Sequence, residues 1–220
     1  MNTGQAVQVL QKGGVLVYPT ETLYALGCLA CNETACRRVA ALKGRPESKP
    51  FPLVVADLDG LLALAASLPS ELAEALPRLA HAFWPGPLSI LVPTRPELPR
   101  LVRDEMGYSS IRISPHPTVQ ILCRTLADQG GQSSRVGSAA LIATSANKSG
   151  QPATARPEQL DPSLLAEVEA GGGANLLDPP WPGGGEPSTL IRITGPNRAK
   201  VLRQGAVSRE NLSSILSLEE

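Results

Sequence analysis

Short apolar runs that end at glycine or proline constrain the fold of this chain more than any other feature of its sequence. The first, Val15-Leu16-Val17-Tyr18, is β-branched and aromatic and stops at Pro19, which predicts a buried strand. Similar runs predict further strands at 51–56, 88–92, 109–114 and 140–143, and a late hairpin from 188–193 and 199–203. In the strand at 109–114, Ile111 and Ile113 should face one side and Arg112 the other.

Helical patterns separate these strands. Asn32 is a candidate N-cap for a helix that reaches Lys43 and ends at Gly44, and Asp57 can cap the next helix. The predicted helices cover residues 4–12, 32–43, 58–66, 70–83, 118–127 and 160–170, with a loose helix in the last dozen residues. Strands that alternate with helices predict one α/β domain with a mixed, twisted open sheet flanked by helices. We expect this domain to span residues 1–210, with 211–220 as a C-terminal tail.

The composition bounds the class of protein. A chain of 220 residues with 42% hydrophobic residues is long enough for one buried core, and its 20 glycines and 21 prolines indicate many ordered turns. A net charge of zero argues against a protein that coats nucleic acid through its overall charge, but it does not exclude a local basic cleft. We find no signal-peptide pattern and no apolar stretch of membrane-spanning length, so we expect a cytoplasmic location without membrane contact.

Four cysteines occur, at 28, 31, 36 and 123. The spacing of Cys28 and Cys31 before a helix is compatible with redox chemistry, but no second close pair completes a zinc site. We therefore expect buried reduced thiols and no metal site.

Three cations, Lys43, Arg45 and Lys49, lie within seven residues, and Gly44 and Pro46 bar regular structure from continuing through them. Such a loop can clamp an anion. A lysine followed by glycine is also typical of an ordinary helix C-terminus. Lys43 alone is therefore compatible with an anion site and with a simple helix end.

Hydroxyl and amide side chains follow two of the predicted strands. Thr144-Ser145-Ala146-Asn147 can approach a phosphate or ribose closely, and Thr20-Glu21-Thr22 begins where a strand ends, a usual place for ligands in α/β sheets. A hydroxyl-rich turn is the alternative for the second segment. Arg112 is either a solvated strand residue or part of a cleft.

Several catalytic signatures are missing, namely the phosphate-binding Gly-x-x-x-x-Gly-Lys-Ser/Thr loop, Gly-x-Gly-x-x-Gly, Gly-x-Ser-x-Gly and His-Glu-x-x-His. The chain has two histidines, His81 and His116, which gives little support for imidazole catalysis. Cations and hydroxyls at strand ends suit a reaction in which the protein positions phosphates and a carboxylate without becoming a nucleophile.

Motifs spread along the chain resemble, in this order, those of the YrdC-like family. They are Tyr18-Pro19-Thr20-Glu21-Thr22-Leu23-Tyr24-Ala25-Leu26-Gly27, Lys43-Gly44-Arg45-Pro46 with Lys49-Pro50, Trp84-Pro85-Gly86-Pro87-Leu88-Ser89, Ser110-Ile111-Arg112-Ile113 before His116-Pro117, Ser145-Ala146-Asn147, Pro187-Ser188-Thr189, and Leu202-Arg203-Gln204-Gly205. The resemblance covers residues 5 to 205 and implies the family's short single-domain form with a concave cationic cleft.

Members of that family are L-threonylcarbamoyladenylate synthases, which combine L-threonine, bicarbonate or CO2, and ATP with Mg2+. Their products are threonylcarbamoyl-AMP and pyrophosphate, and the adenylate is the donor for the t6A modification of tRNA. The resemblance therefore implies a nucleotidyltransferase, with downstream t6A transfer proteins as partners and a weak contact with tRNA.

Site residues follow from the same resemblance. Lys43, Arg45, Lys49, Ser145, Asn147 and Arg203 match nucleotide-binding positions, with Lys43 and Arg45 as the catalytic cations, and Thr22, Arg112 and Thr189 match positions that hold L-threonine. The chain departs from the family's pattern at several positions, among them Ala25 in place of glycine, Ser89 in place of threonine and Ser114 in place of proline. The polar segment from Gly130 to Ser138 has no counterpart in the family.

Two other functions remain as alternatives. The cationic surface could hold RNA without catalysis, but seven aromatic residues, none among the cations, leave little for base stacking. A carbamoyl-adenylate transferase that uses carbamoyl phosphate is the other, and the zinc-finger and acylphosphatase regions of such relatives are missing from this sequence.

Overall fold

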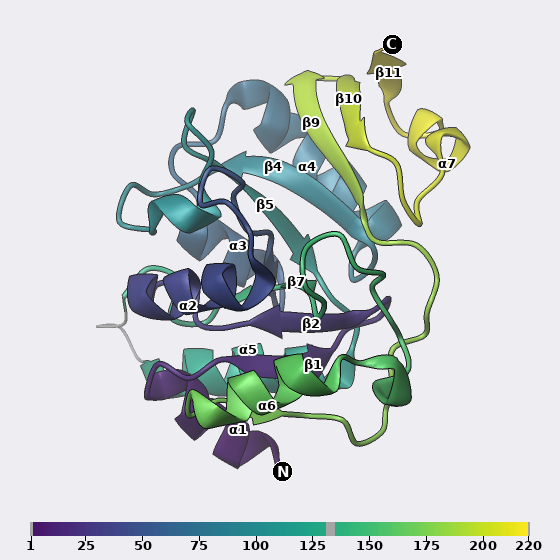
Figure 1. The fold of residues 1–220 in the computed structure, drawn as a ribbon. Helices are drawn as coiled ribbons and strands as arrows, with labels where there is room; N and C mark the ends of the chain where they lie inside the picture. The colour runs from purple at the N-terminus through teal and green to yellow at the C-terminus, as the bar shows by residue number, and fades with distance from the viewer. Residues whose placement is uncertain (1, 131–134, 220) are drawn as a thin grey trace.

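The strands form two sheets that lie side by side, with helices packed around them (Figure 1). The computed structural model describes residues 2–130 and 135–219. The large sheet has the order β11-β10-β9-β4-β5-β3-β6, and the small sheet has the order β7-β2-β1-β8. Parallel and antiparallel pairs occur in both, so the predicted mixed α/β class is confirmed, with the strands divided between two sheets.

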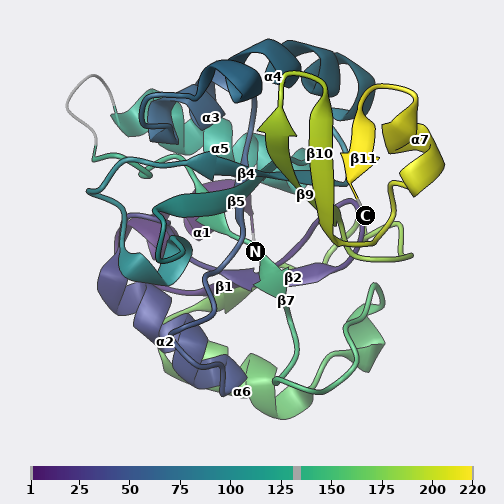
Figure 2. The same ribbon diagram turned by 90° about the horizontal axis from the view of Figure 1, so that it is seen from above.

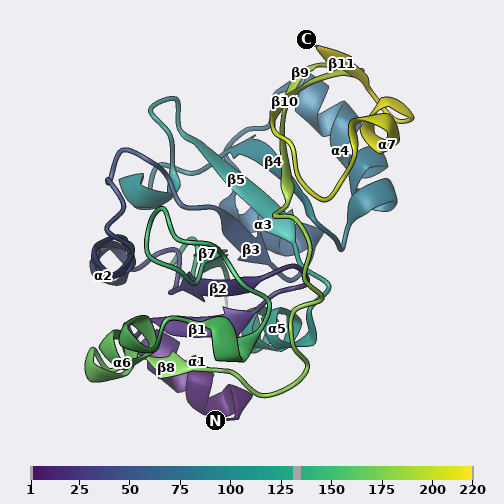
Figure 3. The same ribbon diagram turned by 45° about the vertical axis from the view of Figure 1, so that its right-hand side comes forward.

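The helices are α1 (Thr3–Gln11), α2 (Glu33–Lys43), α3 (Leu58–Leu64), α4 (Ser70–Phe83), α5 (Pro117–Gly130), α6 (Pro162–Ala170) and α7 (Arg209–Ser213). The strands are β1 (Leu16–Pro19), β2 (Tyr24–Gly27), β3 (Leu53–Val55), β4 (Leu88–Pro93), β5 (Tyr108–Ile113), β6 (Leu141–Ile142), β7 (Thr144–Ser145), β8 (Ala174–Asn175), β9 (Thr189–Gly195), β10 (Arg198–Arg203) and β11 (Ser217–Glu219). Figure 3 shows α1, α5 and α6 against the small sheet, with α4 behind the large sheet.

The caps predicted from the sequence are present. The Asn32 side chain accepts a hydrogen bond from the Ala35 amide at 3.0 Å, and Gly44 ends α2 in the left-handed conformation with φ of 59°. Asp57 caps α3 through the Gly60 amide at 2.9 Å. The end of α2 is thereby fixed at Lys43, where the cationic loop begins.

Strands β1 and β3 are buried on both faces, which explains their unbroken apolar sequences. Val17 packs in the main core, whereas Leu16 and Tyr18 pack in a second cluster with α1 and α5. In β3 the central Val54 faces that second cluster and its two neighbours face the main core. Each of the two clusters thus contains residues of both sheets, and Figure 2 shows the two sheets and their helices from above.

Some elements were not predicted. Strand β2 pairs antiparallel with β1 across a turn at residues 20–23, and the short strands β7 and β8 complete the small sheet. The expected C-terminal helix is shorter than predicted, and it is followed by β11, which pairs with β10. The polar segment from Gly130 to Ser138 lies partly outside the described residues, which resume at Arg135.

Candidate active site

A cavity of about 160 Å³ lies where the two sheets meet. Its walls come from the β1–β2 turn, β2, β5, β7 and the cationic loop after α2. The two residues before β9 and the last residue of β10 complete them. The lining residues are Thr20, Thr22, Leu23, Tyr24, Ala25, Arg45, Pro52, Arg112, Ala143, Thr144, Ser145, Pro187, Ser188 and Arg203. Arginines and hydroxyl groups from distant parts of the chain thus share one hollow.

Five of the nine site residues predicted from the sequence line this cavity. They are Thr22, Arg45, Arg112, Ser145 and Arg203. Lys43 and Asn147 are not among the lining residues, but both bond to Ser145, which is. Lys49 and Thr189 are not among the lining residues.

Lys43 organises the segment that carries Ser145. Its ammonium donates hydrogen bonds to the Ser145 carbonyl at 2.6 Å, to the Asn147 carbonyl at 2.7 Å and to the Asn147 side-chain oxygen at 3.2 Å. An ammonium has three protons, so this geometry accounts for all of them. Burial, and next the charge of Arg45, lowers the pKa of Lys43 to about 8.

Arg45 is held by its own loop. Its Nε donates to the Lys49 carbonyl and its Nη2 to the Pro50 carbonyl, both at 3.1 Å, and the guanidinium lies 5.2 Å from the centre of the Phe51 ring. Burial lowers the pKa of Arg45. Lys49 contributes its backbone to this arrangement, while its side chain is exposed.

Hydrogen bonds fix the Arg203 side chain to Ser188. Its Nε and Nη2 donate to the Ser188 carbonyl at 3.1 and 2.8 Å, and Nη2 reaches the Ser188 hydroxyl at 3.0 Å. That hydroxyl lies 2.8 Å from the Ser89 hydroxyl. Burial, then the charges of Arg112 and Arg45, lowers the pKa of Arg203, so Arg203 lies close enough to both guanidinium groups to be repelled by them. A bound anion would relieve this repulsion.

Arg112 lies on the face of β5 that looks into the cavity, as the alternation predicted, while Ile111 and Ile113 lie in the core. Its Nη1 forms a short ion pair with the Glu21 carboxylate, and both side chains are nearly buried. The second Glu21 oxygen accepts a hydrogen bond from the Ser114 hydroxyl.

The two threonines predicted to hold L-threonine differ in position. Thr22 lies in the β1–β2 turn, with its hydroxyl 3.4 Å from that of Thr20, and lines the cavity. The Thr189 hydroxyl is fully buried, donates to the Val207 carbonyl at 2.7 Å and accepts from the Val207 amide at 3.1 Å. Its hydrogen-bonding groups therefore fasten the segment that follows β10.

Sequence reasoning placed Glu21 in a candidate ligand segment without giving it a role of its own, and it gave no role to Ser188. The sequence signal that could have identified them is their position next to residues predicted to bind L-threonine: Glu21 precedes Thr22, and Ser188 precedes Thr189. Their partners are remote in sequence, at Arg112 and Arg203, and no local pattern reveals such contacts.

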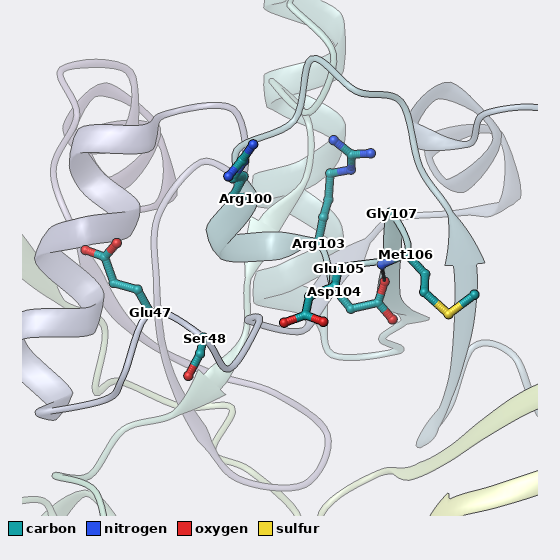
Figure 4. Close-up of a pocket in the computed structure, with 8 residues that line it drawn as sticks. All are labelled: Glu47, Ser48, Arg100, Arg103, Asp104, Glu105, Met106 and Gly107. Atoms are coloured by element: carbon teal, nitrogen blue, oxygen red, sulfur yellow. Dashed lines mark hydrogen bonds between the residues drawn. The ribbon is translucent and has the colours of Figure 1, made fainter.

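A second hollow, of about 740 Å³, lies beside the cationic loop (Figure 4). Glu47 and Ser48 lie on one side of it and the segment from Asp104 to Gly107 on the other, with Arg100 and Arg103 between them. Its three carboxylates oppose the binding of phosphates, and none of the predicted site residues lines it. We therefore place the site at the junction of the sheets.

The thiols lie away from the cavity. All four cysteines are free, and Cys28, Cys36 and Cys123 are buried. The hydrogen bond to Cys36, and then burial, raises the pKa of Cys28. Burial raises the pKa of Cys123 to about 12. A separate finding is that, in the described part of the chain, no helix is long and apolar enough to cross a bilayer.

The fold and this cavity define an α/β protein with a cation-lined hollow between two sheets, a geometry suited to small anions. The chain belongs to the Sua5/YciO/YrdC family, whose model, described as telomere recombination, matches residues 8–205. The family resemblance of the sequence motifs is thereby confirmed.

Relatives with assigned names agree with the family. The threonylcarbamoyl-AMP synthase of Xylella fastidiosa (strain 9a5c) is 35% identical over 193 residues, which are 86% of this chain and 92% of that protein. The threonylcarbamoyl-AMP synthase of Stenotrophomonas maltophilia (strain K279a) is 40% identical over 163 residues, 73% of this chain and 79% of that protein.

Solved structures share the fold. Sua5 of P. abyssi in complex with L-threonine superposes with a TM-score of 0.76 at 26% identity, over 99% of this chain and 58% of that chain. This protein thus spans less than two thirds of that Sua5 chain. E. coli YciO superposes with a TM-score of 0.72 at 24% identity, over 96% of this chain and 92% of that chain, and supports the fold alone.

Proposed function

We propose that this protein is an L-threonylcarbamoyladenylate synthase, which makes threonylcarbamoyl-AMP and pyrophosphate from L-threonine, bicarbonate or CO2, and ATP. The observation that carries the proposal is the shared cavity, in which Arg45, Arg112 and Arg203 meet the hydroxyls of Thr22 and Ser145. The names of the relatives described above give independent support.

The proposal divides the cavity into two ends. Thr22 and Arg112 hold L-threonine, with the planar guanidinium of Arg112 binding the carboxylate through two parallel hydrogen bonds. Arg45, Ser145 and Arg203 hold ATP, and Lys43, which is bonded to the Ser145 carbonyl, adds a buried positive charge. Thr189 supports the wall through Val207 in this arrangement, whereas the exposed Lys49 lies in the same loop as Arg45.

The chemistry needs positioning and charge stabilisation. The amine of L-threonine bonds to CO2 and loses a proton to give a carbamate. One carbamate oxygen then attacks the α-phosphorus of ATP, and the bond from that phosphorus to the pyrophosphate oxygen breaks. Lys43 and Arg45 offset the charge that develops on the leaving pyrophosphate, and no protein nucleophile takes part. The reaction class is nucleotidyl transfer.

Mg2+ enters with ATP in this proposal, as part of the nucleotide substrate. The polar lining of the cavity consists of guanidinium and hydroxyl groups, which fit phosphate oxygens better than a bare cation. The adenylate is then passed to downstream t6A transfer proteins, and the cationic loop that carries the exposed Lys49 makes a weak contact with tRNA. A cytoplasmic location fits these substrates.

The test is pyrophosphate release by the purified protein. With ATP, Mg2+, L-threonine and bicarbonate we expect release that stops when any one of them is left out. Release without L-threonine, or release supported equally by carbamoyl phosphate, would contradict the proposal. Arg112→Ala should raise the KM for L-threonine far more than the KM for ATP, because its guanidinium binds the carboxylate.

A further inference from the structure

Arg112 carries a buried positive charge with one protein partner. Its side chain is 9% exposed, and Glu21 is its hydrogen-bond acceptor among residues 2–130 and 135–219. A buried guanidinium needs such a partner, since an unpaired charge in the interior is costly. Arg112 lines the cavity, whereas Glu21 is not among the lining residues.

The Glu21 carboxylate is in turn held in place by Ser114. The Ser114 hydroxyl accepts a hydrogen bond from the His116 amide at 3.2 Å, and its single proton is directed to the second oxygen of Glu21. Ser114 is completely buried, so water does not compete for this proton. The hydroxyl fixes one end of the carboxylate while the other end meets Arg112.

The backbone of Glu21 is also fixed. The Gly183 amide donates to the Glu21 carbonyl at 3.2 Å, and the Gly184 amide donates to the Thr22 carbonyl at 2.9 Å. A β-carbon on Gly183 would lie 3.1 Å from that same Glu21 carbonyl, which shows how closely the two segments approach. The position of the carboxylate is therefore set before any ligand arrives.

We propose that Glu21 is a positioning residue for Arg112 and that Ser114 anchors it. This inference rests on the proposed function. Glu21 engages Nη1 of the guanidinium, which fixes the orientation of the planar group and leaves its other N–H donors for the carboxylate of L-threonine.

The alternative role for Glu21 is that of a competitor, a carboxylate that occupies Arg112 until L-threonine displaces it. The two roles predict opposite effects. Loss of a positioning carboxylate loosens the guanidinium and weakens L-threonine binding, whereas loss of a competitor strengthens it.

The experiment measures pyrophosphate release by Glu21→Ala, Glu21→Gln and Ser114→Ala, with separate titrations of L-threonine and ATP. For Glu21→Ala we expect the KM for L-threonine to rise about tenfold or more, while the KM for ATP changes by less than about twofold. Glu21→Gln keeps an acceptor oxygen at the same reach and should restore part of the loss. Ser114→Ala should raise the KM for L-threonine about threefold.

Glu33→Gln is the matched control, because Glu33 forms an exposed ion pair with Arg37 and should leave both KM values unchanged. An unchanged or lower KM for L-threonine in Glu21→Ala overturns the proposal, as does an equal rise of both KM values. Should Glu21→Ala fail to fold in thermal unfolding, Ser114→Ala decides by the same comparison. An inactive wild-type protein would instead refute the proposed function, so the two failures are distinguishable.

Discussion

The Lys43 ammonium donates hydrogen bonds to both the carbonyl and the side-chain oxygen of Asn147, at 2.7 and 3.2 Å. These residues are more than a hundred positions apart, and the contact joins the end of α2 to the turn after β7. The cation predicted to bind phosphate therefore also builds the wall of the cavity.

Lys43→Met should destabilise the protein, because it leaves the carbonyls of Ser145 and Asn147 without their buried donor. Charge-assisted hydrogen bonds contribute about 1.5 to 3 kcal/mol, so we expect the free energy of unfolding to fall by about 2 to 3 kcal/mol. Urea denaturation measures this change, with the exposed Lys12→Met as the control. Equal unfolding midpoints for both variants would show that the contact is energetically neutral.

ATP affinity should decrease as the pH rises through about 8. The pKa of Lys43 is lowered to about 8 by burial and by Arg45, so the ammonium is charged below that pH and neutral above it. Phosphate binding favours the charged form, and the KM for ATP should therefore climb between pH 7 and 9. Lys43→Gln should bind ATP weakly across this range without that step. An equal rise in the KM for ATP between pH 7 and 9 in Lys43→Gln would show that another group is responsible for the pH dependence.

Arg203→Lys should impair ATP binding while leaving L-threonine binding nearly unchanged. A lysine keeps the charge but loses the paired donors that clamp Arg203 onto the Ser188 carbonyl. At about 1.4 kcal/mol per factor of ten, we expect the KM for ATP to rise about ten- to a hundredfold. Steady-state titrations of both substrates measure these KM values. A larger rise in the KM for L-threonine than in the KM for ATP would contradict the assignment of Arg203 to the ATP end of the cavity.

Local physical chemistry made much of the fold predictable. The Asn32 and Asp57 caps set where α2 and α3 begin, and Gly44 sets where α2 ends. The alternation in β5 set the direction of Arg112 because a strand has a period of two. Each of these signals lies within a few residues of the feature that it determines.

What the sequence did not predict depends on contacts between distant segments. Strand β2 was missed because Tyr24 to Gly27 follows β1 after a hydroxyl-rich turn and carries no alternation of its own. The division into two sheets follows from β6 and β7, which are separated by Ala143 alone and pair with different strands. Likewise, the ion pair of Glu21 with Arg112 joins positions 91 residues apart. Only the folded chain brings such groups together.

Gly27→Ala should be among the most destabilising small substitutions in this protein. A β-carbon at Gly27 would lie 1.7 Å from the Ile142 carbonyl oxygen, a backbone atom at the point where β2 meets β6. The Ile142 amide bonds to the Cys28 carbonyl at 2.9 Å, so the two backbones cannot separate without losing the link between the sheets. We expect a loss of about 3 kcal/mol in the free energy of unfolding, at the upper end for overpacking. Gly4→Ala in α1 is the control, since its β-carbon would meet ordinary contacts at 3.5 Å and alanine favours a helix. Urea denaturation of both variants tests this, and a Gly27→Ala protein as stable as Gly4→Ala would mean that the sheets can move apart freely at the edge of the proposed site.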